Sequence, residues 1–107
     1  MERAQFVKLS TKALRHLDDA LGELEHEDLD VDLAGDVLTL DFSDGTSFII
    51  NAHSAAGQIW MAANRSAWHF DYVAEGERWV ADKTGDELYA AVSREVGNKL
   101  GTSIEIR

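Results

Sequence analysis

The sequence predicts an α+β fold, a two-layer α-β sandwich with helices from both ends of the chain on one face of an antiparallel sheet of about five or six strands. Apolar residues recur at helical spacing near both ends of the chain. Between these segments they alternate with polar residues, as in half-buried strands. Short turn sequences join successive strands, which favours antiparallel pairing and leaves the helices on a shared face. A chain of 107 residues is expected to form a single domain, residues 1–107.

The first helix is predicted over residues 5–24. Its apolar face contains Phe6, Leu9, Ala13, Leu17, Leu21 and Leu24. On the polar side, Lys8, Lys12 and Arg15 precede the acidic residues Asp18, Asp19 and Glu23. This order is unfavourable for the helix macrodipole, which prefers anions near the N-terminus. An unfavourable placement suggests that the charges have a use.

The central segment predicts a series of strands, at residues 28–33, 37–42, 46–51, 58–64, 68–73 and 78–81. In the first of them, aspartates alternate with Leu29, Val31 and Leu33, so the two sets lie on opposite faces. Turn sequences containing Gly35 and Gly45 separate the first three strands.

The second helix is predicted to begin with a capping box formed by Thr84 and Glu87. Apolar residues then follow at helical spacing, namely Leu88, Val92, Val96 and Leu100. Gly101 suits the end of a helix, and the tail at residues 102–107 alternates once more.

The net charge of −10 comes from one segment of the chain. No Lys or Arg occurs between Arg15 and Arg65, whereas eight carboxylates fall between Asp18 and Asp32. Such a field repels nucleic acids and anionic membranes, and attracts cations or a basic protein surface. One interpretation is a solvated acidic face that keeps the protein soluble, and another is an acidic mimic of nucleic acid.

Other features exclude several classes of protein. The sequence has no cysteine, which excludes disulfides and thiolate metal sites. No apolar run is long enough to span a membrane, and no signal peptide is recognisable, so we expect a cytoplasmic protein. No nucleophile motif or phosphate-binding loop is present, so we expect a binding and regulatory protein rather than an enzyme.

Several motifs occur in a recognisable order: GDVLTLDF, QIW, HFDY, RWVAD and TGDEL. Together with the acidic end of the first helix, they resemble the bacterial frataxin (CyaY) family from Phe6 to Arg107. The loop at residues 51–57 departs from the family, which usually carries a Gln and a Pro there. The resemblance implies an α-β sandwich that binds iron and takes part in iron–sulfur cluster assembly.

The acidic segment is the candidate iron site. Carboxylate oxygens suit Fe²⁺, Fe³⁺, Mn²⁺, Ca²⁺ and Mg²⁺, and an open surface would bind these cations weakly. The candidate ligands are Asp18, Asp19, Glu23, Glu25, Glu27, Asp28, Asp30 and Asp32. A calcium loop beginning at Asp28 is excluded because Leu33 and Thr39 occupy its required Gly and Glu positions. Whether His16 or His26 joins the site stays open.

The candidate partner surface contains Asp18, Asp19, Glu23, Asn51, Gln58 and Trp60. If Ile59 and Met61 face the helices, Trp60 lies on the open face of the sheet, and an exposed Trp is a frequent binding hot spot. The alternative is the reversed register. Trp68 and Trp79 are expected to be structural, and His53 and His69 are assigned no role.

The resemblance implies docking on the cysteine desulfurase and the iron–sulfur scaffold protein, with regulation of cluster assembly. The chain is expected to be a monomer, with metal-induced oligomers as an alternative. Two other functions stay open at this point. One is an iron-oxidising or iron-storage protein, and the other is an acidic docking module with no physiological metal.

Overall fold

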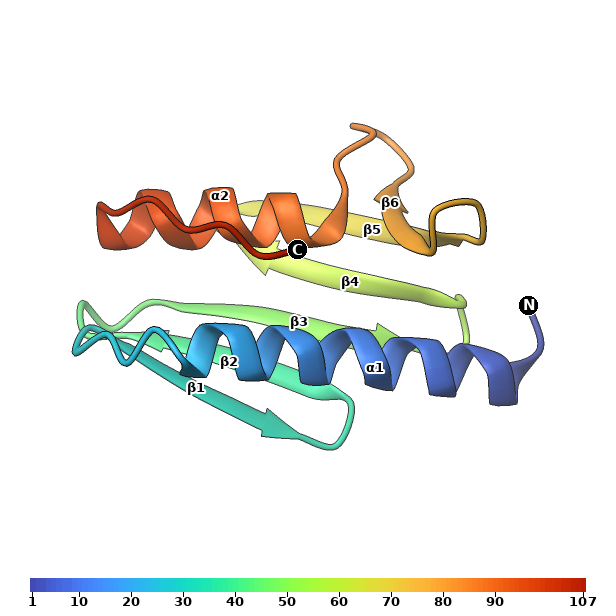
Figure 1. Cartoon of the computed structure of the whole chain (residues 1–107), viewed down its shortest axis with the longest axis horizontal. Coiled ribbons are helices and arrows are strands. Elements are labelled where there is room, and N and C mark those ends of the chain that lie inside the picture. The colour runs from blue at the N-terminus through green and yellow to red at the C-terminus, as the bar shows by residue number, and fades with distance from the viewer.

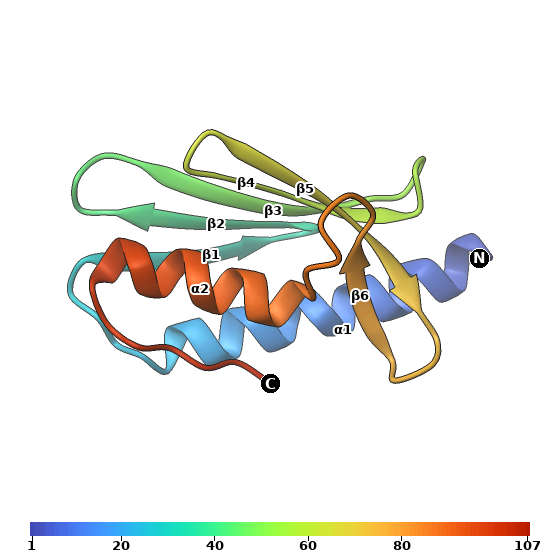
Figure 2. The same ribbon diagram turned by 90° about the horizontal axis from the view of Figure 1, so that it is seen from above.

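The computed structural model describes all 107 residues as two layers, with two helices packed on one face of a six-stranded sheet (Figures 1 and 2). The sheet is antiparallel throughout, with strand order β1-β2-β3-β4-β5-β6. The elements are α1 (Arg3–Gly22), β1 (Leu29–Ala34), β2 (Val37–Phe42), β3 (Ser47–His53), β4 (Gln58–Ala63), β5 (Ser66–Val73), β6 (Arg78–Ala81) and α2 (Leu88–Leu100). The predicted fold class is therefore confirmed. Neither helix is long and apolar enough to cross a membrane.

The core lies between the helices and one face of the sheet. Alternate residues of each strand point into it, so that Leu38, Leu40 and Phe42 of β2 are buried while their neighbours are not. α1 contacts β1, β2 and β3, and α2 contacts β6 at the opposite edge of the sheet. The two helices run side by side in the same direction, as both views show (Figures 1 and 2). The other face of the sheet carries no helix.

The boundaries of α1 differ slightly from the prediction. The helix begins at Arg3 and ends at Gly22, so Leu24 lies beyond it and is 39% exposed instead of completing the apolar face. Its first turn contains no acidic residue and its last turn no basic residue. The unfavourable placement of charge along the macrodipole is thus a feature of the folded helix.

The predicted capping box of α2 was wrong. Glu87 is itself the N-cap, and its carboxylate accepts hydrogen bonds from the backbone N–H groups of Tyr89 and Ala90 at 2.9 and 3.0 Å. Thr84 instead pairs with Asp86, since its hydroxyl donates to the Asp86 carboxylate and accepts from the Asp86 N–H. This local bond keeps the chain in a turn, so the helix begins three residues later than the capping box implied.

Asp86 links β5 and α2 next to the point where α2 begins. Its carboxylate accepts hydrogen bonds from the Arg94 guanidinium and from the indole N–H of Trp68. Chiefly because Arg94 donates to it, the pKa of the Asp86 carboxyl is lowered. Trp68 and Trp79 are both buried, which confirms their structural role.

The C-terminal tail returns along the two helices instead of forming a strand (Figure 1). The backbone N–H of Ile106 donates to the buried hydroxyl of Ser93, and the Ile106 side chain enters the core. Gly97 permits this approach, because a Cβ there would lie 2.8 Å from the carbonyl oxygen of Thr102. Gly101 ends α2 with a φ of 70°, as its position in the sequence predicted.

The N-cap assignment can be tested by mutation. Glu87→Ala removes both acceptor bonds and is expected to lower the free energy of unfolding by about 1 kcal/mol. Glu87→Gln keeps a carbonyl acceptor and should cost clearly less. Urea unfolding followed by circular dichroism measures both, and an equal loss in the two variants would contradict the assignment.

Candidate functional site

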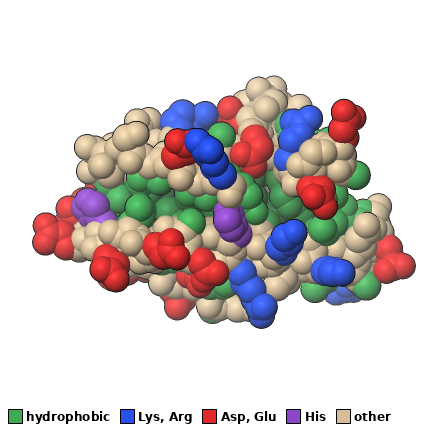
Figure 3. Space-filling view, in the orientation of Figure 1, with side chains coloured by type: hydrophobic (Ala, Val, Ile, Leu, Met, Phe, Trp, Pro, Cys, Tyr) green, Lys and Arg blue, Asp and Glu red, His purple; other side chains and the backbone are tan.

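The candidate iron ligands lie at the end of α1, in the connection after it and on the edge strand β1. We define the acidic ridge as Asp18, Asp19, Glu23, Glu25, Glu27, Asp28, Asp30 and Asp32. Seven of the eight are exposed, and Asp18 is half-buried. Figure 3 shows acidic side chains at the end of the molecule where α1 finishes, and basic ones along the other half of that helix.

No basic side chain neutralises the ridge. The four ion pairs of the molecule join Arg94 to Asp86 and Glu95, Lys99 to Asp44, and Arg107 to Glu105. The only acidic residue among residues 18–44 with a cationic partner is thus Asp44. A hydrogen bond from Lys99, at 2.6 Å, is the main reason that the pKa of the Asp44 carboxyl lies well below its usual range.

The ridge presents its oxygens in two directions. Asp30 and Asp32 lie on the open face of the sheet, because Leu29, Val31 and Leu33 occupy the core side of β1. Asp19 and Glu23, in contrast, lie on the outer side of α1 and at its end. No three His, Asp or Glu side chains lie close enough together to form a preformed metal-binding group. Cations would therefore meet one or two carboxylates at a time, with water completing their coordination.

Sequence reasoning missed Asp41 as a neighbour of the ridge. Asp30 and Asp41 are direct partners across the β1-β2 pair, on the open face. The signal was available, since a two-residue turn at Gly35-Asp36 fixes the register that places the two carboxylates opposite each other. Like charges in this arrangement repel, and the hydrogen bond from the Ser47 hydroxyl to Asp41 satisfies only part of that carboxylate.

The two histidines considered for the metal site have other contacts. The Nε2–H of His16 donates to the carbonyl oxygen of Arg107 at 2.6 Å, and the imidazole lies against Tyr89. The Nδ1 of His26 accepts from the backbone N–H of Asp28 at 3.1 Å, which holds the connection after α1.

Trp60 lies half-buried on the open face, while Ile59 and Met61 are buried on the other side of β4. Its ring stacks between two imidazoles, with His53 at 3.9 Å and His69 at 4.5 Å between ring centres. The structure thus gives both histidines contacts with a candidate partner residue, although sequence analysis assigned them none. The strand register places His69 directly opposite Trp60, so their proximity could be expected from the sequence. The stacking of the rings depends on side-chain rotamers and could not.

Hydrogen bonds also fix the Trp60 indole. Its N–H donates to the side-chain carbonyl of Gln58 at 2.9 Å, and the Gln58 amide donates to Asp71 at 3.0 Å. Asn51 is the cross-strand partner of Trp60. The structure therefore brings Asn51, Gln58 and Trp60 together in one polar and aromatic cluster on β3 and β4. The acidic ridge lies at the β1 side of the same sheet.

Comparison with known sequences gives one family. The sequence model of the family described as "Frataxin-like domain" matches residues 1–102. Proteins named "Iron-sulfur cluster assembly protein CyaY" are similar over almost the whole chain. The Cupriavidus necator protein is 30% identical over 99% of this chain and 96% of its own length. The Pseudomonas fluorescens protein is 33% identical over 98% of this chain and 94% of its own length.

Solved structures give the same result. Frataxin from Psychromonas ingrahamii superposes with a TM-score of 0.90 at 26% identity, covering 100% of this chain and 99% of that one. Trimeric frataxin from Saccharomyces cerevisiae, complexed with ferrous iron, gives a TM-score of 0.76 at 29% identity. It covers 88% of this chain and 87% of that one.

Because Asp30 and Asp41 repel each other across the strand pair, we expect the ridge to lower the free energy of unfolding. Asp30→Asn should raise the free energy of unfolding by about 0.5 kcal/mol in low salt, because it removes a direct cross-strand repulsion. The gain should shrink at high salt, where exposed charges are screened. Asp82→Asn removes an equal charge from an exposed turn away from the ridge and serves as the control in urea titrations. A gain of the same size in both variants would rule out the pairwise repulsion.

Proposed function

This chain belongs to the frataxin-like domain family, and we propose that it binds iron at the acidic ridge and regulates iron–sulfur cluster assembly. The observation that carries the proposal is the ridge itself. Eight carboxylates on adjoining elements have no Lys or Arg partner, although they repel one another and stability would favour neutralising them. The CyaY name of the relatives supports the assembly role.

Iron is the cargo in this proposal, and the ridge residues are its ligands. Exposed carboxylates on a convex surface impose neither a coordination number nor a geometry, so Fe²⁺ and Fe³⁺ bind weakly and other divalent cations substitute. Weak binding suits a protein that must release its metal. The ferrous complex of the yeast frataxin supports iron as the ion.

The proposed partners are the cysteine desulfurase and the scaffold protein, in the cytoplasm, with no role for nucleic acid or membrane. Asp18, Asp19 and Glu23 provide a negative surface that steers a basic patch toward α1. The cluster of Asn51, Gln58 and Trp60 provides the second contact. Stacking and hydrogen bonds already hold the Trp60 indole, so little side-chain entropy is lost when a partner covers it.

We propose a non-catalytic monomer, with metal-induced oligomers as an alternative. The trimeric yeast relative supports the capacity for oligomers. An iron-oxidising or iron-storage role on the same ridge is the main alternative. Oxygen consumption with Fe²⁺ distinguishes the two, since a binding and regulatory protein should consume oxygen no faster than buffer containing the same iron.

Neutralising part of the ridge tests the iron proposal. Asp18→Asn, Asp19→Asn and Glu23→Gln combined should weaken Fe²⁺ binding at least about tenfold, because a charged oxygen ligand is replaced at three positions. Paramagnetic broadening of backbone amide signals at the end of α1 should disappear. Isothermal titration calorimetry and two-dimensional NMR under anaerobic conditions measure both effects.

A matched control removes three acidic charges elsewhere: Glu75→Gln, Asp82→Asn and Glu105→Gln. It gives the same net charge as the ridge variant and should keep both the affinity and the broadening. If the two triple variants lose iron equally, only the overall charge matters and the ridge is not the site.

Trp60 tests the partner surface separately. Trp60→Ala should leave Fe²⁺ affinity unchanged and weaken the complex with desulfurase and scaffold by about tenfold or more, as expected for a central aromatic contact. Trp60→Phe keeps most of the stacking and should lose less. Surface plasmon resonance with each purified partner measures the effect. Unchanged affinity of Trp60→Ala for both partners would remove Trp60 from the interface.

A further inference from the structure

The first half of α1 carries a cationic surface that the acidic ridge does not explain. Lys8, Lys12 and Arg15 are exposed, and none of them forms an ion pair. They lie nearer the N-terminal end of the helix, where the macrodipole disfavours cations. In a protein with a net charge of −10, these three cations at neighbouring positions on one helix make the surface locally positive.

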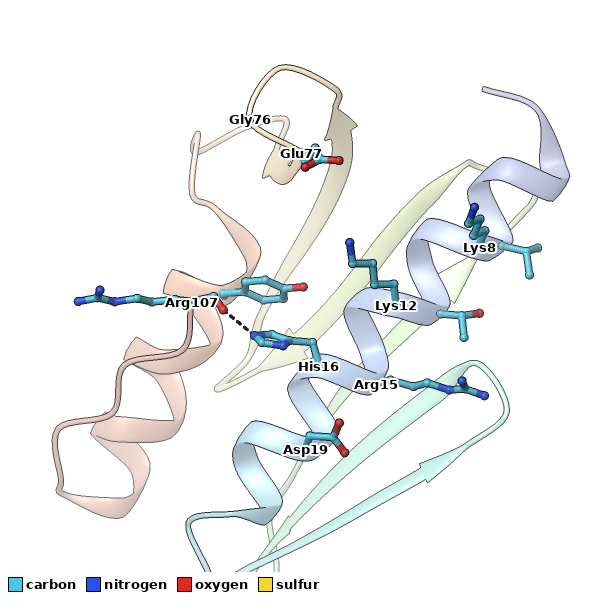
Figure 4. Close-up of a pocket in the computed structure, with 11 residues that line it drawn as sticks. Lys8, Lys12, Arg15, His16, Asp19, Gly76, Glu77 and Arg107 are labelled. Atoms are coloured by element: carbon cyan, nitrogen blue, oxygen red, sulfur yellow. Dashed lines mark hydrogen bonds between the residues drawn. The ribbon is translucent and has the colours of Figure 1, made fainter.

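These cations border a hollow on the helical side of the molecule. It measures about 790 Å³ and lies between α1, the start of α2 and the turn that joins β5 to β6. Figure 4 shows Lys8 and Lys12 extending from α1 on the side of that turn, which carries Gly76 and Glu77, whereas Arg15 extends away from it along the outside of the helix. Tyr89 and His16, whose rings lie 4.9 Å apart, also line the hollow.

The remaining charges at the hollow are few. Arg107 contributes its backbone carbonyl, which accepts from His16, while its guanidinium pairs with Glu105 and points away from the hollow (Figure 4). Asp19 and Glu77 are the two side-chain carboxylates of the lining, and the main-chain oxygen of Arg107 is a further acceptor. Asp19 lies almost two helical turns beyond Lys12, at one end of the hollow, whereas Glu77 lies on the turn toward which Lys8 and Lys12 extend.

We propose that this hollow binds a small anion bearing two or more phosphate or carboxylate groups. Lys8 and Lys12 are four residues apart on one helix, so their attachment points are separated by about 6 Å. A ligand with two linked anionic groups can contact both ammonium groups at once, whereas one inorganic phosphate contacts them less completely. Arg15, on a flexible side chain, adds longer-range attraction.

The dimensions favour a small molecule over a macromolecule. A volume of about 790 Å³ lies in the range of small-molecule sites. A nucleic acid or an anionic membrane would also meet the acidic ridge, which begins on the same helix only three residues beyond Arg15. The acidic ridge therefore repels a long polyanion that extends over it, whereas a compact dianion at the hollow does not extend that far.

Pyrophosphate is the probe that tests this site, titrated into the full-length, metal-free protein at fixed ionic strength. We expect amide shift changes confined to residues 7–19, 76–77 and 89, and weaker binding of inorganic phosphate. Lys12→Gln should weaken pyrophosphate binding by about tenfold, the effect of losing one charge-assisted hydrogen bond. Lys83→Gln removes an equal charge from an exposed turn outside the hollow and should bind normally.

Asp19→Asn should change affinity in the opposite direction, because it removes a carboxylate that repels the anion. Citrate in place of pyrophosphate shows whether carboxylates are accepted as well as phosphates.

The proposal fails if pyrophosphate produces no shift changes, if Lys12→Gln and Lys83→Gln bind equally, or if heparin binds tightly at this face while pyrophosphate does not. Concentration-dependent self-association that pyrophosphate leaves unchanged would instead assign the cationic surface to contacts between copies. Iron affinity plays no part in these measurements, so their failure is independent of the proposed function.

Discussion

Both helices pack on the same face of the sheet, and this one-sided packing determines where every other feature lies. Each strand must place alternate residues in the core, which leaves the opposite set facing outward along all six strands. Leu38, Ile50 and Ile59 are fully buried for this reason. The outward set is free of packing requirements, and it carries Asp30 at one edge and Trp60 at the centre. Apolar burial on one side thus permits uncompensated charge and an aromatic cluster on the other.

The α1 helix likewise has one side in the core and one side exposed along its whole length. Its inner side is apolar except for Ser10 and packs on the sheet, so its outer side can vary in charge without loss of packing. Cations occupy the first half and carboxylates the second, against the preference of the macrodipole. The cost is small for exposed groups, typically about 0.3–1 kcal/mol each, and hydrophobic burial by the same helix exceeds it. One helix therefore supports two surfaces of opposite charge.

The sequence allowed the fold to be predicted because period and turn chemistry act locally. Alternation put Trp60 on the face opposite Ile59 and Met61 but left open which of the two faces the helices cover. The turn at Gly35 would even have given the Asp30–Asp41 pair. The start of α2 was mispredicted because Thr84 and Glu87 satisfy the spacing of a capping box, while the competing bond between Thr84 and Asp86 depends on the three-dimensional turn. The stack around Trp60 was missed because it requires particular rotamers of His53 and His69. The hollow beside α1 joins segments that are distant in the chain, and no local pattern indicates it.

Asp19 belongs both to the acidic ridge and to the lining of the hollow, so the two proposed sites share a group. A cation held at Asp19 would neutralise a carboxylate that repels an anion near Lys12. By linkage, an anion in the hollow would strengthen cation binding at Asp19 by the same factor. The coupling needs no conformational change, since both ligands act on one charge through a short distance in space. A cation and a multivalent anion would then bind this end of α1 more tightly together than either does alone, and the other ridge carboxylates, farther from the hollow, would not share the effect.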